Sequence, residues 1–138
     1  MSQDTPEGPG VVPGPWPSGG RPLRLSAAVP ELPVRDVFRA QLWYHKRLGF
    51  QIGWHNHAGR IGAVTLGECI LFLRQSARPG GAAWIFAEDV DAVWRDWEAR
   101  GAAPDGPPRD MPWGLRQFTQ ADLCGNCLTV HHDLDARE

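Results

Sequence analysis

Two segments of the chain carry apolar residues three or four positions apart, which is the spacing of one face of a helix. In the first segment these residues are Val37, Ala40, Tyr44 and Leu48. In the second segment they are Val90, Val93, Trp94 and Trp97. Asp36 and Asp89 stand where a helix N-cap is expected, and Gly49 and Gly101 stand where a helix can end. The pattern therefore predicts two helices, each buried along one stripe.

Shorter apolar or alternating runs predict strands around each helix. In the first half of the chain they cover residues 50–55, 61–66 and 69–73. In the second half they cover residues 83–87, 115–120 and 127–131, and residues 105–112 are predicted to be a loop. Residues 25–34 are also extended, because Pro30 and Pro33 exclude a helix and favour an edge or exchanging strand. Both halves repeat one strand–helix–strands unit, which indicates an internal duplication.

Proline and glycine are unevenly distributed, and this sets the limits of the folded part. The chain of 138 residues contains 16 Gly and 13 Pro, and residues 6–22 are dense in both. Such a stretch cannot bury enough apolar surface to offset the ordering of its backbone. Residues 1–22 are therefore predicted to be a disordered tail, residues 23–133 a single domain, and residues 134–138 a polar C-terminal tail.

Charge and cysteine content narrow the class of protein. The net charge of −2 provides no bulk field that would favour nucleic acid or an anionic membrane. No apolar run approaches the roughly 18 residues of a membrane span, and the first residues lack the pattern of a secretory signal. The odd number of cysteines, 3, suits free thiols in a reducing compartment. We therefore expect a cytoplasmic protein that binds neither nucleic acid nor a membrane.

The strongest metal-binding candidate is the pair Cys124 and Cys127, which is followed by His131 and His132. Strand alternation places Cys127 and His131 on one face and His132 on the other, which leaves fewer than the four ligands of a structural zinc site. Cys69 would complete the set only if the fold brought it close. We interpret the cysteines as structural or incidental.

Histidines elsewhere offer weaker candidates. His55 and His57 flank a single residue, and their imidazoles could serve as ligands or as a general base. The simpler interpretation is that they are exposed loop histidines, because no nearby carboxylate would orient them. His45 is expected at the surface of the first helix. The sequence contains no Ser-His-Asp spacing and no phosphate-binding glycine loop, so nothing indicates covalent catalysis.

The tryptophans are the most informative residues, since the chain has 7 Trp against 1 Tyr. Three of them are expected in the core, namely Trp43, Trp94 and Trp97. Three others stand at strand ends or in a loop, namely Trp54, Trp84 and Trp113. A large ring at such a position covers the end of a sheet or contacts a flat or cationic ligand.

Four stretches of the chain resemble one family. They are Ala28-Val29-Pro30-x-Leu32-x-Val34-Arg35-Asp36-Val37, Trp43…Arg47-Leu48-Gly49-Phe50, Ala83-Trp84-Ile85…Asp91 and Pro112-Trp113-Gly114-x-Arg116…Gly125-Asn126-Cys127. The sequence thereby resembles the bleomycin-resistance, antibiotic-binding proteins of the glyoxalase or vicinal oxygen chelate superfamily. The likeness extends over nearly all of residues 25–133. The Leu-Gly-Phe and Gly-Asn elements are common to the superfamily, whereas the Ala-Val-Pro, Ala-Trp and Pro-Trp-Gly elements are more particular to the antibiotic-binding branch.

The resemblance implies an α+β fold of two βαβββ modules, whose curved mixed sheets form an open cleft. It also implies a homodimer that exchanges its N-terminal strand around a proline, matched here by Pro30, and binds its ligand in grooves between subunits. The residues that correspond to the groove lining are Trp54, Arg74, Trp84, Trp113 and the backbone of Gly114. These tryptophans are then expected to stack on a planar aromatic molecule.

The resemblance also bears on metal and catalysis. Metal-dependent members carry ligands at positions that correspond to Val29, to Ala82 or Ala83, and to Thr129. None of these side chains is a usual ligand for a first-row metal. The sequence therefore predicts no metal, no cofactor and no catalytic residue, and a protein that confers resistance by sequestering its ligand.

One departure concerns the charge of the ligand. The family's loop after Leu-Gly-Phe is acidic, but residues 53–58 contain no carboxylate, and Arg74 replaces a small polar residue. Both changes weaken attraction for a strongly cationic drug such as bleomycin and favour a neutral or weakly anionic flat ligand. Two alternatives stay open: a metal-dependent lyase, isomerase or dioxygenase that uses His55, His57 or His131, and a metal-free module that binds a metabolite or partner.

Overall fold

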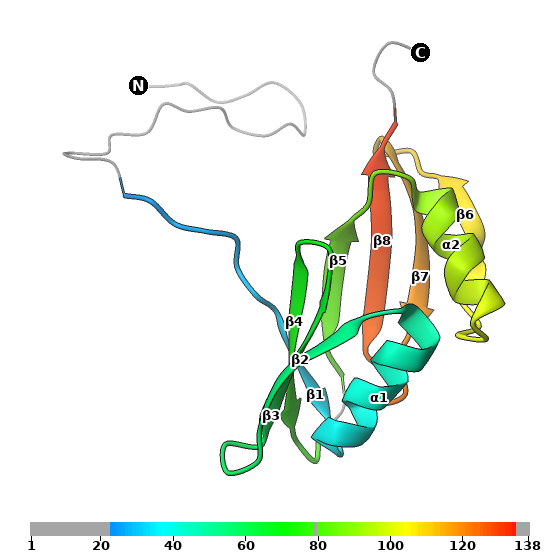
Figure 1. Cartoon of the computed structure of the whole chain (residues 1–138). Helices are drawn as coiled ribbons and strands as arrows, with labels where there is room; N and C mark the ends of the chain where they lie inside the picture. Colours follow the sequence, from blue (N-terminus) through cyan, green and yellow to red (C-terminus); the bar gives the residue numbers. More distant parts are fainter. Residues whose placement is uncertain (1–22, 79, 135–138) are drawn as a thin grey trace.

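The computed structural model describes residues 23–78 and 80–134, which form two βαβββ modules (Figure 1). The elements of the first module are β1 (Glu31–Val34), α1 (Val37–Leu48), β2 (Gln51–Asn56), β3 (Ile61–Leu66) and β4 (Cys69–Gln75). Those of the second are β5 (Ala82–Phe86), α2 (Val90–Ala99), β6 (Asp105–Asp110), β7 (Leu115–Ala121) and β8 (Cys127–Asp133). The four-stranded sheets have the orders β1-β4-β3-β2 and β5-β8-β7-β6, each with one parallel pair. The α+β fold of two modules is confirmed.

Both helices begin at the predicted caps. The side chain of Asp36 accepts a hydrogen bond from the backbone N–H three residues later at 2.9 Å, and Asp89 does the same at 3.1 Å. Gly49 ends α1 in the left-handed region with φ 78°. α2 ends at Ala99 with Arg100 as its C-cap, and Gly101 follows with φ 80°. These contacts are local, which is why the sequence pattern located both helices. Within the described ranges, neither helix is long and apolar enough to cross a membrane.

Strand β6 forms where a loop was predicted, so that expectation was wrong. Gly106, Pro107 and Pro108 disfavour a strand interior, but β6 is the edge strand of its sheet, where a proline need not donate to a neighbour. Its pairing with β7 is interrupted by a register shift between Asp105 and Arg109. Pairing with a distant strand therefore overrides the local turn signals.

The N-terminal strand is shorter than predicted. Only Glu31–Val34 form β1, whereas the preceding residues run away from the two modules (Figure 1). Leu23 and Leu25 are 85% and 89% exposed, because the segment has no neighbouring strand within the described chain. β1 pairs with β4 of the same chain, and the carbonyl of Pro30 accepts a hydrogen bond from the Phe72 N–H at 3.0 Å. Strand exchange around Pro30 stays a prediction, and the two predicted tails, apart from Leu134, lie outside the described residues.

One hydrophobic core extends through both modules on the helix side of the sheets. Trp97 is buried there as predicted, and its Nε1–H donates to the carbonyl of Leu48 at 3.0 Å, which links α2 to the end of α1. Trp43 and Trp94 are partly buried against the same core. The opposite face of each sheet carries no helix within the described residues (Figure 1). We call these two surfaces the open faces.

A buried carboxylate also joins the modules. Asp122, in the turn between β7 and β8, accepts hydrogen bonds from the Tyr44 hydroxyl at 2.6 Å and from the Asn126 side chain at 2.8 Å. It also accepts from the backbone N–H groups of Cys124 and Asn126. The Asn126 side chain donates in turn to the carbonyl of Pro33 in β1 at 2.8 Å. This network therefore connects α1, β1 and the β7–β8 turn.

The ionisation of Tyr44 offers a direct test of this network. Burial raises the pKa of Tyr44 well above its ordinary value of 10.0, and the negative charge of Asp122 raises it further. Because the raised pKa belongs to the folded state, the stability it contributes is present below pH 10 and is lost as the pH rises through the folded pKa. Tyr44 is the only tyrosine, so tyrosinate absorbance reports it alone. We expect that absorbance to appear only on alkaline unfolding; its appearance near pH 10 in the folded protein would contradict the network.

Candidate functional site

Aromatic side chains gather on the open face of the second sheet. Trp84 and Phe86 of β5 point away from the core, as strand alternation requires, and are 58% and 60% exposed. His131 of β8 lies beside both, with ring centroids 5.6 Å from Trp84 and 6.0 Å from Phe86, in edge-to-face geometry. The three rings form an aromatic surface that no helix covers within the described residues.

Trp113 extends this surface across the sheet. It lies in the turn between β6 and β7, is 58% exposed, and its Nε1–H donates to the Gln117 side chain at 3.0 Å. Gln117 stands opposite His131 in the β7–β8 register. Trp84, His131, Gln117 and Trp113 therefore form one row across three adjacent strands, which we call the open-face row. Two strand spacings make the sheet beneath this row roughly 10 Å wide, about the length of a fused aromatic ring system.

Gly114 shapes the turn that presents Trp113. Its φ of 91° lies in the left-handed region, which favours glycine at this position. Its N–H donates to the carbonyl of Met111 at 3.0 Å, and its own carbonyl accepts from the N–H of Leu134 at 2.9 Å. Both backbone groups already make hydrogen bonds within the chain, and Gly114 allows the turn that carries Trp113. A place for the Gly114 backbone in the groove lining stays a prediction.

Trp54 and Arg74 lie on the open face of the first sheet and not beside the open-face row. Trp54 packs edge-on against Phe72 with ring centroids 5.2 Å apart and is 45% exposed. Arg74 forms an ion pair with Glu31 at 2.7 Å, with both side chains about half exposed. The charge that Arg74 brings to this face is therefore offset by Glu31. Within one chain, the predicted groove residues are divided between two sheets.

Comparison with known families decides the identity of the fold. The model of the Glyoxalase/Bleomycin resistance protein/Dioxygenase superfamily matches residues 26–130. The chain belongs to this superfamily.

Several solved structures share the architecture at low sequence identity. TioX from Micromonospora sp. ML1 is 26% identical with a TM-score of 0.66, and the match covers 79% of this chain and 100% of TioX. A bleomycin resistance determinant encoded on transposon Tn5 is 20% identical with a TM-score of 0.70, covering 79% and 98% of the two chains. A bleomycin-binding protein in complex with bleomycin is 20% identical with a TM-score of 0.68, covering 79% and 99%. No curated protein sequence matches the chain significantly.

In this superfamily member the cysteine and histidine candidates for a metal do not converge. Cys127 and His131 belong to the open face, whereas the His132 Nδ1 accepts a hydrogen bond from the Val90 N–H at 3.0 Å on the helix side. The sulfur of Cys124 instead accepts from the backbone N–H of Arg35 at 3.4 Å. Across residues 23–78 and 80–134, no three His, Cys, Asp or Glu side chains gather as a metal site would require.

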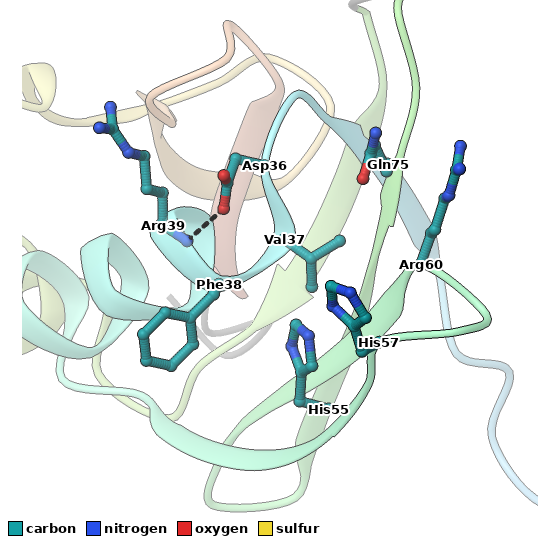
Figure 2. A pocket seen from close by; sticks show the side chains of 8 residues that line it. All are labelled: Asp36, Val37, Phe38, Arg39, His55, His57, Arg60 and Gln75. Carbon is teal, nitrogen blue, oxygen red and sulfur yellow. Dashed lines mark hydrogen bonds between the residues drawn. The ribbon is translucent and has the colours of Figure 1, made fainter.

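The remaining histidines lie around α1. His45 is at the surface, with its Nδ1 2.8 Å from the carbonyl of Phe50. His55 and His57 lie on the helix side of the first sheet, where they line a pocket with the first turn of α1 (Figure 2). They are therefore separated by the sheet from the open face that carries Trp54.

Phe86, His131 and Gln117 belong to the surface but were not assigned to it from the sequence. Phe86 had a usable signal, because it stands two positions after Trp84 and strand alternation places both on one face. The contributions of His131 and Gln117 depend on the cross-strand register of β7 and β8, which no local pattern specifies.

Proposed function

We propose that this protein binds a flat aromatic small molecule, such as an antibiotic, and protects by sequestering it without chemical change. The observation that carries this proposal is the open-face row together with Phe86, an exposed apolar surface with a polar centre. Exposed aromatic surface of this kind marks a ligand or protein contact. The likeness in fold to a bleomycin-binding protein in complex with bleomycin supports the same kind of ligand.

The proposed groove is formed by two subunits of a homodimer. Within one chain, Trp54 and the open-face row lie on separate sheets, so one open face would supply each wall of the groove. The exposed leucines before β1, Leu23 and Leu25, are consistent with a segment that packs on a partner. Micromolar sequestration needs about 8 kcal/mol, whereas aromatic stacking contributes about 0.5–1.5 kcal/mol per pair, so burial between two walls must supply most of the affinity.

Calorimetric titration with bleomycin and with a neutral anthraquinone tests the proposal. We expect Trp84→Ala to weaken binding of the preferred probe by about 5- to 150-fold, since loss of a stacked ring removes roughly 1–3 kcal/mol. Leu42→Ala is the control, because Leu42 is also a large, exposed apolar residue (45%) but lies on α1, away from the open faces. Its binding should equal that of the wild type.

Two results would overturn the proposal. One is the absence of binding of either probe at high micromolar concentration. The other is a stoichiometric metal in protein purified without chelator, lost on replacement of His131, which would support a metal-dependent enzyme of the same superfamily. Preference for the anthraquinone over bleomycin would agree with the missing acidic loop at residues 53–58.

A further inference from the structure

A pocket of about 540 Å³ lies between the first turn of α1 and the β2–β3 hairpin (Figure 2). Val37 and Phe38 form its apolar side, and the imidazoles of His55 and His57 point from the hairpin toward them. A second hollow beside it is lined by Arg35 and residues 75–77, together with Arg60. Arg60 and Gln75 line both hollows, so the two hollows adjoin each other on the helix side of the first sheet. We call the two hollows together the groove.

A buried amide holds His55 in one tautomer. The Gln41 Nε2 lies 2.8 Å from the carbonyl oxygen of Trp54 and 3.1 Å from that of Ala63, and both of these can only accept. The Gln41 Oε1 must therefore face the His55 Nδ1, at 2.9 Å, and accept a hydrogen bond from its N–H. The neutral His55 imidazole is left with Nε2 as an acceptor. The partner that orients His55 is therefore the side-chain amide of Gln41 and not a carboxylate.

The neighbouring Arg60 is held in an unfavourable backbone conformation. Its φ is 57°, in the left-handed region that glycine adopts more readily. Its N–H donates to the carbonyl of His57 at 3.2 Å, and its own carbonyl accepts from the N–H of Gln75 at 2.9 Å. These two hydrogen bonds fix the backbone of Arg60. They hold its side chain at the mouth of the groove, at a position where glycine would be less strained. Strain of this kind at a surface position is a reason to look for a function.

The groove is positive in a chain whose net charge is −2. Arg35, Arg39 and Arg60 line it, against the single carboxylate of Asp36. Asp36 already caps α1 through the Arg39 N–H at 2.9 Å, and the Arg39 guanidinium points away from the imidazoles (Figure 2). Across the described ranges, the ion pairs involve other arginines and leave Arg35 and Arg60 without a carboxylate.

We propose that this groove is a second binding site, for a small organic anion that joins a carboxylate or phosphate group to an apolar ring. The anionic group pairs with Arg60 and Arg35, and the ring lies on Val37 and Phe38. A hydroxyl or N–H of the ligand donates to the His55 Nε2. The site is on the opposite side of the first sheet from the open face, so it does not depend on the function proposed above.

The test uses benzoate and phenyl phosphate as probes and benzyl alcohol as the neutral control. Imidazole and backbone NMR signals of His55 and His57 follow binding to the whole chain at low salt. We expect both anions to shift these signals saturably, benzyl alcohol to shift them little, and added salt to weaken binding. The tighter of the two anions identifies the chemical class of the ligand, carboxylate or phosphate.

Arg60→Gly separates the role of the side chain from that of the backbone. Glycine relieves the left-handed strain, so the variant should fold at least as stably as the wild type, while its affinity for the preferred anion falls at least about tenfold. Arg95→Gln removes the same charge from an exposed position on α2 and should leave the affinity unchanged. The proposal would be overturned if millimolar anion caused no saturable shifts. It would also be overturned if Arg60→Gly and Arg95→Gln lost affinity for the anion equally. Trp84→Ala, which tests the open face, should leave anion binding intact.

Discussion

Replacement of Asp122 by alanine should lower the free energy of unfolding by about 3–5 kcal/mol, the cost of removing one partner from a buried polar network. Asp122 is 6% exposed and accepts from the Tyr44 hydroxyl, two backbone N–H groups and the Asn126 side chain. Alanine leaves these donors buried without an acceptor, and each unpaired group is costly. Urea unfolding followed by tryptophan fluorescence measures the loss.

Asp105→Ala is the matched control for Asp122. Asp105 is exposed on the edge strand β6, and its side chain accepts a single long hydrogen bond, 3.4 Å, from Thr119. Its loss should change stability by no more than about 0.5 kcal/mol. A loss below about 1 kcal/mol for Asp122→Ala would show that the network contributes little. Because Asn126 also donates to Pro33, we further expect the Asp122 variant to exchange the amide hydrogens of β1 faster.

Gly62→Ala should lower the free energy of unfolding by about 2–3 kcal/mol. It should also break the hydrogen bond to Gln41 that keeps the His55 proton on Nδ1. A Cβ at Gly62 would lie 2.6 Å from the Gln41 Nε2 and 2.9 Å from a methyl carbon of Val37. Gln41 is fully buried and cannot move without losing its bonds to the carbonyls of Trp54 and Ala63. The loss combines overpacking with buried groups left unpaired. Urea unfolding measures stability, and the NMR signal of the His55 Nδ1 proton reports the tautomer.

Gly53→Ala in the neighbouring strand serves as the control for Gly62. A Cβ at Gly53 would be 3.4 Å from the Ala63 Cβ and 3.7 Å from a methyl carbon of Thr65, which is ordinary contact. We expect little change in stability and an unaltered His55 signal. If both variants changed stability and the His55 signal equally, the effect of Gly62→Ala would come from a general effect of a side chain in a strand. It would then not come from contact with Gln41.

The two faces of the first sheet carry different chemistry. Its open face presents Trp54 and the ion pair of Arg74 with Glu31. Its helix side holds the oriented His55 and Arg60, which has no ion pair within residues 23–78 and 80–134. Superfamily membership and the likeness to bleomycin-binding proteins identify the fold but not the ligand of either face. The variants Trp84→Ala and Arg60→Gly therefore test the two proposed binding sites separately.

Much of the fold could be predicted because its determinants are local. The caps at Asp36 and Asp89 and the spacing of apolar residues lie within one or two turns, so they defined both helices and the burial of Trp97. Alternation defined most strands. β6 was missed because its residues carry turn chemistry, and only its pairing with β7 at the sheet edge makes it a strand.

The candidate sites were less predictable, since they depend on contacts between distant segments. By itself the sequence determined the duplicated α+β fold, the superfamily and the exposed positions of Trp84 and Trp113, because short-range periodicity and motifs carry that information. Only the tertiary structure decided that Trp54 lies on a separate sheet, that His131 and Gln117 complete the open-face row, and that Gln41 orients His55. Those relations follow from strand register and from helix packing on a sheet, which bring together side chains that no local pattern relates.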